Sequence, residues 1–105
     1  MKRVEYFQTS TGREPCKEWL YGLDRVTLYK INAFIDRVAQ GAAKKNIRSL
    51  GDGVFEIKID YGPGYRVYFG EVRNVIILLL VGGDKKSQFR DIWQAKDYWR
   101  EYVSK

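Results

Sequence analysis

Residues 54–69 read VFEIKIDYGPGYRVYF and are the most informative segment about the fold. Residues 55–60 alternate between apolar and polar side chains, which is typical of a strand with one buried face. The segment YGPG at residues 61–64 contains two glycines and a proline, and therefore predicts a turn. Residues 65–69 alternate again, so the stretch predicts two antiparallel strands joined by a short connection.

The apolar faces of these two strands restrict their register. Directly opposed residues lie on the same face of a sheet, so apolar residues meet only where the two residue numbers sum to an even number. We expect Ile59 opposite Val67 and Lys58 opposite Tyr68, with a connection of five or three residues or a bulge. This arrangement predicts that Lys58, Arg66 and Tyr68 share an exposed polar face of the sheet.

The flanking segments predict helices and further strands. Apolar residues recur at spacings of three and four after Asp24, which indicates a helix that ends at Gly41. The apolar run at residues 75–81 predicts a strand covered on both faces, ended by Gly82-Gly83-Asp84. We therefore expect an α+β fold: an N-terminal strand near Val4, a helical hairpin (about Glu14 to Leu23, then 24–41), a three-stranded antiparallel meander and a C-terminal helix with Phe89, Ile92, Ala95, Trp99 and Tyr102 as its apolar stripe.

Composition narrows the class of protein. The 105 residues fit one domain, 1–105, and 45% hydrophobic residues are enough for a folded core. A net charge of +6 favours a polyanionic partner such as nucleic acid. With no His and one Cys the usual zinc ligand sets cannot be built, so we expect neither metal nor cofactor, and Cys16 is interpreted as a packing residue. The absence of a signal-like N-terminus or a long apolar segment predicts a cytoplasmic protein with no membrane partner.

The predicted polar face and the following loop offer groups for phosphodiester chemistry. Lys58 and Arg66 lie on that face, and the loop at residues 85–88 supplies Lys85, Lys86 and Gln88. RNA provides its own 2′-hydroxyl nucleophile, so a protein needs only proton transfer and charge stabilisation. A lysine crowded by other cations can serve as a base, whereas an arginine can stabilise charge through a forked contact. The alternative is structural: cross-strand ion pairs of these residues, and a solvated basic loop.

Three segments resemble a known family. The run LGDGVFEIKIDYGPGYRVYF at 50–69, the run LLVGGDKKSQ at 79–88, and the pairs Asp91-Ile92 and Ala95-Lys96 are similar to the RelE/ParE superfamily of bacterial toxins, and most of all to its HigB-like branch of addiction module killer proteins. A GYRVYF strand followed by a GGDKKSQ loop at this spacing is the specific part of the resemblance.

The resemblance implies the toxin of a type II toxin–antitoxin system, a metal-independent endoribonuclease that cleaves mRNA on the ribosome. Its partners would be mRNA, the ribosome and a cognate antitoxin of helix-turn-helix type, with DNA contacted only through the antitoxin. The residues expected to carry catalysis are Lys58, Arg66, Lys85 and Tyr68, and those expected to bind RNA are Lys86, Gln88, Arg48 and Glu56. The chain departs from several nuclease members in having no His and in carrying Glu56 where some have a second Lys.

Two other functions are compatible with the same resemblance. One is inhibition of DNA gyrase by binding without catalysis, as in the ParE branch. The other is a non-toxic module that binds the antitoxin and acts as a co-repressor. Fold alone does not distinguish these from RNA cleavage, because the superfamily contains both activities.

Overall fold

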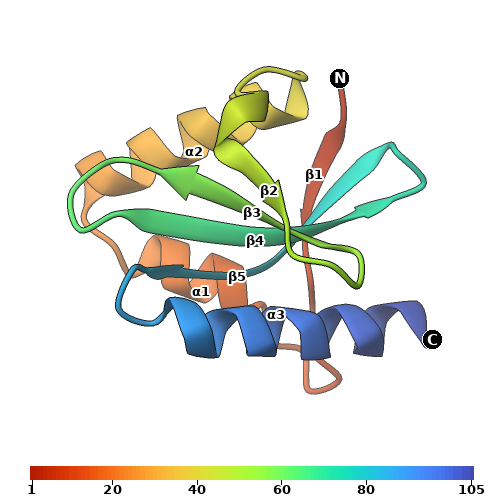
Figure 1. Cartoon of the computed structure of the whole chain (residues 1–105). Helices are drawn as coiled ribbons and strands as arrows, with labels where there is room; N and C mark the ends of the chain where they lie inside the picture. The colour runs from red at the N-terminus through yellow and green to blue at the C-terminus, as the bar shows by residue number, and fades with distance from the viewer.

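The computed structural model describes residues 1–105 as a five-stranded mixed sheet with three α-helices (Figure 1). The strands lie in the order β1-β5-β4-β3-β2, and β1 is parallel to β5 while the other neighbours are antiparallel. The α+β fold expected from sequence is therefore confirmed. Its elements are β1 (Arg3–Tyr6), α1 (Pro15–Tyr21), α2 (Arg25–Ala39), a 3₁₀ turn η1 (Lys44–Asn46), β2 (Ile47–Ser49), β3 (Val54–Ile59), β4 (Tyr65–Val72), β5 (Ile76–Asp84) and α3 (Gln88–Val103).

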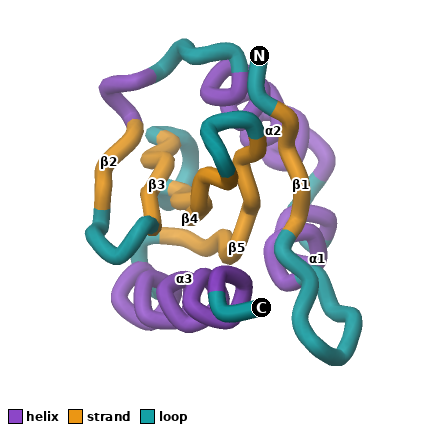
Figure 2. Tube along the Cα trace, turned by 90° about the vertical axis from the view of Figure 1, so that its right-hand side faces the viewer, coloured by secondary structure: helices purple, strands orange, loops and turns teal.

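Helices cover both faces of the sheet. The larger core lies between the sheet and the α1–α2 hairpin and includes Leu20, Ile31 and Ile57. The smaller core lies between the sheet and α3 and includes Tyr68, Leu80 and Ala95. Figure 2 shows α3 running beneath the sheet, with α1 and α2 on the other side. The exposed polar face expected from the strand alternation is therefore wrong for most of its length, because α3 packs on it.

A β-bulge lets β5 serve both cores. Tyr68 pairs with Val81 and Phe69 pairs with Leu79, so Leu80 is an extra residue in β5. Because a bulge shifts the alternation by one residue, Leu80 and Val81 both lie in the core under α3, whereas Leu79 faces α1 and α2. The prediction that this apolar run is covered on both faces is confirmed.

The register of β3 and β4 was predicted correctly in its parity and wrongly in its position. Ile59 pairs with Tyr65, Ile57 with Val67 and Lys58 with Arg66. The residue numbers sum to an even number, and the connection at residues 60–64 has five residues, as expected. The partner of Ile59 is Tyr65, which lies two residues nearer the turn than the expected Val67. Within the turn, Gly62 and Gly64 take positive φ values of +56° and +81°, which glycine adopts without strain.

The sequence did not predict β2, which forms one edge of the sheet. Ile47 pairs with Ile57 and Arg48 with Glu56, so β2 extends the meander by one strand. A strand of three residues is too short to show an alternation in the sequence. The expected N-terminal helix is also shorter than predicted, since α1 ends at Tyr21. The expected start of the second helix is confirmed, because the Asp24 carboxylate accepts a hydrogen bond of 3.1 Å from the backbone N–H of Thr27.

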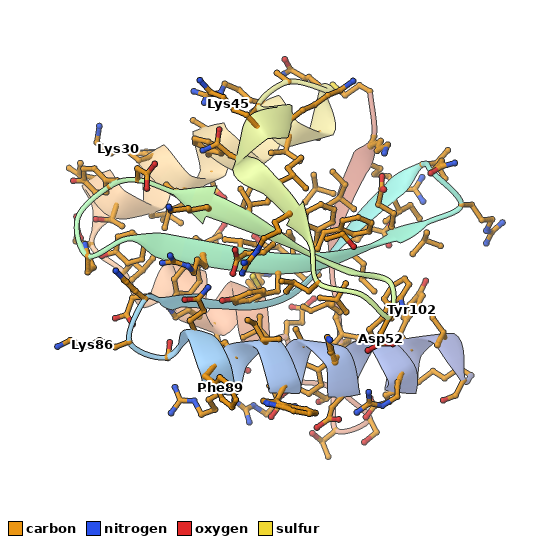
Figure 3. The ribbon with its side chains drawn as sticks, in the orientation of Figure 1. Lys30, Lys45, Asp52, Lys86, Phe89 and Tyr102 are labelled. Atoms are coloured by element: carbon orange, nitrogen blue, oxygen red, sulfur yellow. The ribbon has the colours of Figure 1, made fainter.

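Two strands contain a glycine at a position where an aromatic ring packs directly on the backbone. The sequence predicted that Gly82 ends β5, but the strand runs on to Asp84 and the ring of Trp19 lies over Gly82. Trp99 lies over Gly70 in the same way, at distances that leave no room for a Cβ atom. Phe89, expected in the apolar stripe of α3, is instead 79% exposed, because it projects from α3 away from the sheet (Figure 3).

The contact between Gly70 and Trp99 predicts a loss of stability on substitution. A Cβ atom at residue 70 would lie 2.2 Å from the ring of Trp99, so Gly70→Ala forces the indole off the sheet. We expect the free energy of unfolding to fall by about 1–3 kcal/mol, the usual cost of overpacking. Urea unfolding measures it, and combining Gly70→Ala with Trp99→Leu should recover part of the loss. An additive double variant would contradict the proposed clash.

The single cysteine is a packing residue, as predicted. Cys16 is fully buried in the core between α1 and the sheet, and burial raises the pKa of its thiol to about 12. We expect native protein at pH 8 to react with iodoacetamide only as fast as it opens, and unfolded protein to react at once. Because the unfolded thiol ionises first, stability should also decline as pH rises from about 9 towards 12. Rapid labelling of the native protein would contradict this burial.

None of the helices has both the length and the apolar composition that crossing a bilayer requires.

Candidate nucleic-acid interface

The β3–β4 pairing places the predicted site residues at one end of the α3 face. Lys58 lies opposite Arg66, and Glu56 lies opposite Tyr68. Helix α3 begins at Gln88 beside them, so the end of the sheet near the 60–64 turn is less covered than its middle. The site therefore lies where the second core stops and the polar part of the sheet face begins. In Figure 1 this is the end of β3 and β4 beside the start of α3.

Glu56 connects three segments of the chain at this end. Its carboxylate is buried, with the residue only 3% exposed. Arg48 Nη2 lies 3.2 Å from Oε1, Arg66 Nε lies 3.8 Å from Oε2, and Gln88 Nε2 donates a hydrogen bond of 3.0 Å to Oε2. A buried carboxylate is stable only when it is paired in this way. Glu56 therefore holds the side chains of β2, β4 and α3 in fixed positions, as the predicted structural role of ion pairing implied.

Arg66 is held in place by the 60–64 turn and by Glu56. The residue is 7% exposed, and its Nη1 donates a hydrogen bond of 3.1 Å to the carbonyl of Gly64. Its Nε has no hydrogen-bond partner, although the Glu56 carboxylate lies within ion-pair distance. Our expectation that Arg66 is an exposed side chain is wrong, since Glu56 and the 60–64 turn enclose it. An oriented guanidinium that lines both hollows is suited to bind an anion in either of them.

Two adjoining hollows meet at Lys58 and Arg66. The first, of about 270 Å³, is lined by residues of η1, β2, β3, β4 and the start of α3. The second, of about 350 Å³, is lined by the 60–64 turn and Lys85. Together they bring in five basic side chains against the carboxylates of Glu56 and Asp60; these are Lys45, Arg48, Lys58, Arg66 and Lys85.

The two lysines of the predicted basic loop point to different places. The Asp84 carboxylate accepts hydrogen bonds from the backbone N–H groups of Lys86 (2.9 Å) and Ser87 (3.2 Å), which fixes a tight turn. Lys85 lines the second hollow with Lys58. Lys86 lines neither of the two hollows and projects into solvent from the outer side of the turn (Figure 3). The structure therefore brings Lys85 and Gln88 to the expected site and leaves Lys86 outside it.

We expected Tyr68 to lie on an exposed face of the sheet, and this prediction is wrong because α3 covers it. It is fully buried and lies in the second core, and its hydroxyl makes no hydrogen bond. Burial raises the pKa of this phenol well above its usual value, and the nearby charge of Glu56 raises it further. A neutral, enclosed hydroxyl of this kind is poorly placed to exchange a proton with a bound ligand.

Sequence reasoning missed two polar residues of the first hollow, Lys45 and Asn46. Lys45 and Asn46 lie in η1 and line it, and Asn46 Nδ2 donates a hydrogen bond of 3.0 Å to the carbonyl of Lys58. Figure 3 shows Lys45 above the sheet beside η1. The basic run at residues 44–48 was the available signal, but without β2 nothing connected it to β3.

These features define an α+β protein with a cation-lined cleft at one end of its sheet. Such a cleft can bind phosphate groups through several contacts, and its affinity would fall with salt as counterions are released. The fold, with its mixed five-stranded sheet, is consistent with the RelE/ParE superfamily.

Comparison with known proteins places the chain in a family without assigning it an activity. No family model matches the sequence. An uncharacterized protein of Haemophilus influenzae is 51% identical over 67 residues, which make up 64% of this chain and 67% of the relative. This chain belongs to the same family as that protein.

Proposed function

We propose that the protein is the toxin of a type II toxin–antitoxin system and cleaves mRNA on the ribosome without a metal, in the bacterial cytoplasm. A cognate antitoxin, of the helix-turn-helix type that the sequence resemblance implies, would neutralise it. The observation that carries the proposal is Arg66: an oriented guanidinium at the junction of two cation-lined hollows.

The five basic side chains around Arg66 support a phosphodiester ligand. They come from four separate segments of the chain: η1, β2, the β3–β4 pair and the 84–87 turn. Each of the two hollows can hold a separate phosphate group. The arrangement therefore suits a nucleic-acid strand, which carries several phosphates, better than one small anion. In this proposal Lys45, Arg48 and Lys85 hold the flanking phosphates, and Arg66 binds the scissile one.

The proposed reaction uses the 2′-hydroxyl of RNA as nucleophile. Lys58 accepts the proton of this hydroxyl, whose oxygen then attacks the adjacent phosphorus. Arg66 stabilises the charge that develops on the phosphorane oxygens. The bond to the 5′-oxygen breaks, that oxygen takes up a proton from water, and a 2′,3′-cyclic phosphate remains. Lys58 is assigned this role because it is the exposed titratable side chain opposite Arg66, whereas Tyr68 is enclosed.

The test is to map mRNA ends after induction of the protein in bacteria. We expect growth arrest and new mRNA 5′ ends within translated codons, found by primer extension. In a purified translation system, cleavage should need ribosomes. Intact mRNA with DNA damage would favour gyrase inhibition instead, and a non-toxic protein that binds its antitoxin tightly would favour the co-repressor function. Either result would contradict the proposed nuclease.

A further inference from the structure

A third hollow lies on the outer side of the 84–87 turn, apart from the two that meet at Arg66. It has a volume of about 450 Å³ and is lined by α1, the end of β5 and the first turn of α3. Its walls include Trp19 from α1, Lys86 from the turn, and Arg90 and Asp91 from α3. Lys86 lines neither of the first two hollows, but it does line this one.

Two glycines at the end of β5 make room for the walls of this hollow. A Cβ atom on Gly82 would lie 2.1 Å from the ring of Trp19, and one on Gly83 would lie 2.0 Å from Asp91 Oδ2. Trp19 is thus seated directly on the strand, with its other ring contact an edge-on arrangement with Tyr65 at 6.1 Å. The hollow therefore has one aromatic wall whose position is fixed by packing.

The opposite wall provides cations and a buried acceptor. Lys86 forms no ion pair, and the side chain of Arg90 is 82% exposed, with its Nε 3.7 Å from Asp91 Oδ1. Asp91 is buried; its Oδ2 accepts a hydrogen bond from Ser87 Oγ, while its Oδ1 accepts none. Most of the positive charge of Lys86 and Arg90 is therefore available to a ligand.

This combination matches the parts of a nucleotide. Cations bind its phosphate, an aromatic ring stacks with its base, and a carboxylate oxygen accepts a hydrogen bond from an N–H group on the edge of the base. The hollow also adjoins the main site, because Gly83 on its floor pairs with Arg66 on the next strand and the 84–87 turn separates the two places.

We infer that this third hollow is an additional nucleotide-binding subsite, which receives single-stranded RNA that continues from the Arg66 site over the 84–87 turn. The inference rests on the proposed function, since it takes RNA to be the ligand. Lys86 and Arg90 bind the phosphate beyond the turn, and Trp19 contacts the base.

The experiment compares 2′-O-methylated RNA oligonucleotides of two lengths, which bind but cannot be cleaved. We expect the hexanucleotide to bind about tenfold more tightly than the trinucleotide, because the longer strand gains a stacked base and phosphate contacts. It should also move the NMR signal of the Trp19 indole N–H, which the trinucleotide should leave in place. Lys86→Ala and Arg90→Ala should each remove most of this gain, since neither side chain carries a packing role.

Arg73→Asn provides a matched control. It removes one positive charge at the β4–β5 turn, at the opposite end of β5 from the hollow (Figure 1), and Asn tolerates the positive φ of that position. This variant should keep the full gain from the longer strand. A loss equal to that of Arg90→Ala would show a general charge effect and overturn the inference.

Two further outcomes separate this inference from the proposed function. If both oligonucleotides bind equally and move signals around Arg66 but not that of Trp19, the subsite is wrong while the proposed RNA site stands. If neither moves signals at either place, the proposed function fails and the subsite with it. A response of Trp19 to 5′-AMP but to neither oligonucleotide would show a site for free nucleotides and overturn the continuation of the strand.

Discussion

Replacing Arg66 with alanine is expected to reduce the rate of RNA cleavage by about two to three orders of magnitude, the usual effect of removing one donor that stabilises a developing oxyanion. Arg66 is the only guanidinium that lines both hollows, and its orientation is fixed by Glu56 and the carbonyl of Gly64. The measurement is the single-turnover rate of cleavage of ribosome-bound mRNA by the purified variant.

The controls for this variant follow from the contacts of Glu56. In Arg66→Ala the Glu56 carboxylate still has Arg48 and Gln88 as partners, so we expect the fold to persist, which circular dichroism and urea unfolding check. Arg66→Lys keeps the positive charge but loses the forked hydrogen-bonding geometry of the guanidinium. Its cleavage rate should therefore lie between those of Arg66→Ala and the wild type. Arg73→Asn should cleave as fast as the wild type. Cleavage by Arg66→Ala at the wild-type rate would place the reaction elsewhere.

Replacing Tyr68 with alanine is expected to lower the free energy of unfolding by about 3–5 kcal/mol, as for other large aromatic residues removed from a core. Tyr68 is the largest fully buried side chain of the protein and lies at the centre of the contact between the sheet and α3. A loss of this size is a large fraction of the stability of a small domain. Urea unfolding of the purified variant measures it.

The matched variant Tyr68→Phe separates packing from chemistry. The hydroxyl is buried without a hydrogen-bond partner, so its removal should leave stability unchanged or raise it by up to about 1 kcal/mol. Because that hydroxyl is enclosed, cleavage should continue at close to the wild-type rate. A strong loss of cleavage with stability retained would return Tyr68 to the catalytic role that the sequence resemblance implied, and would show that α3 moves when RNA binds.

These two residues show how far the sequence can predict a site. The alternation in residues 54–69 correctly placed Glu56, Lys58, Arg66 and Tyr68 on one face, because side chains in a strand alternate whatever packs against them. It could not show that α3 covers part of that face. Arg66 and Tyr68 are adjacent outward positions of one strand, yet one lies at the cleft and the other in a core.

The same limit explains the basic residues that were misplaced or missed. Lys85 and Lys86 are neighbours in sequence, but the turn held by Asp84 sends them to different hollows. Lys45 joins the site only because β2 pairs with β3, and a strand of three residues leaves no periodic signal. Hydrogen bonds and pairings between distant segments decide such positions, and local patterns do not record them.

Local periodicity, turn chemistry and composition were enough to predict the α+β class, the parity of the central hairpin, the capped start of α2 and the burial of Cys16. The strand order, the bulge in β5 and the part of the polar face left open beside Arg66 became visible only in the folded chain. These features depend on burial, which is a property of contacts between elements. The position of α3 on the sheet therefore settled which side chains form a core and which remain available to a ligand.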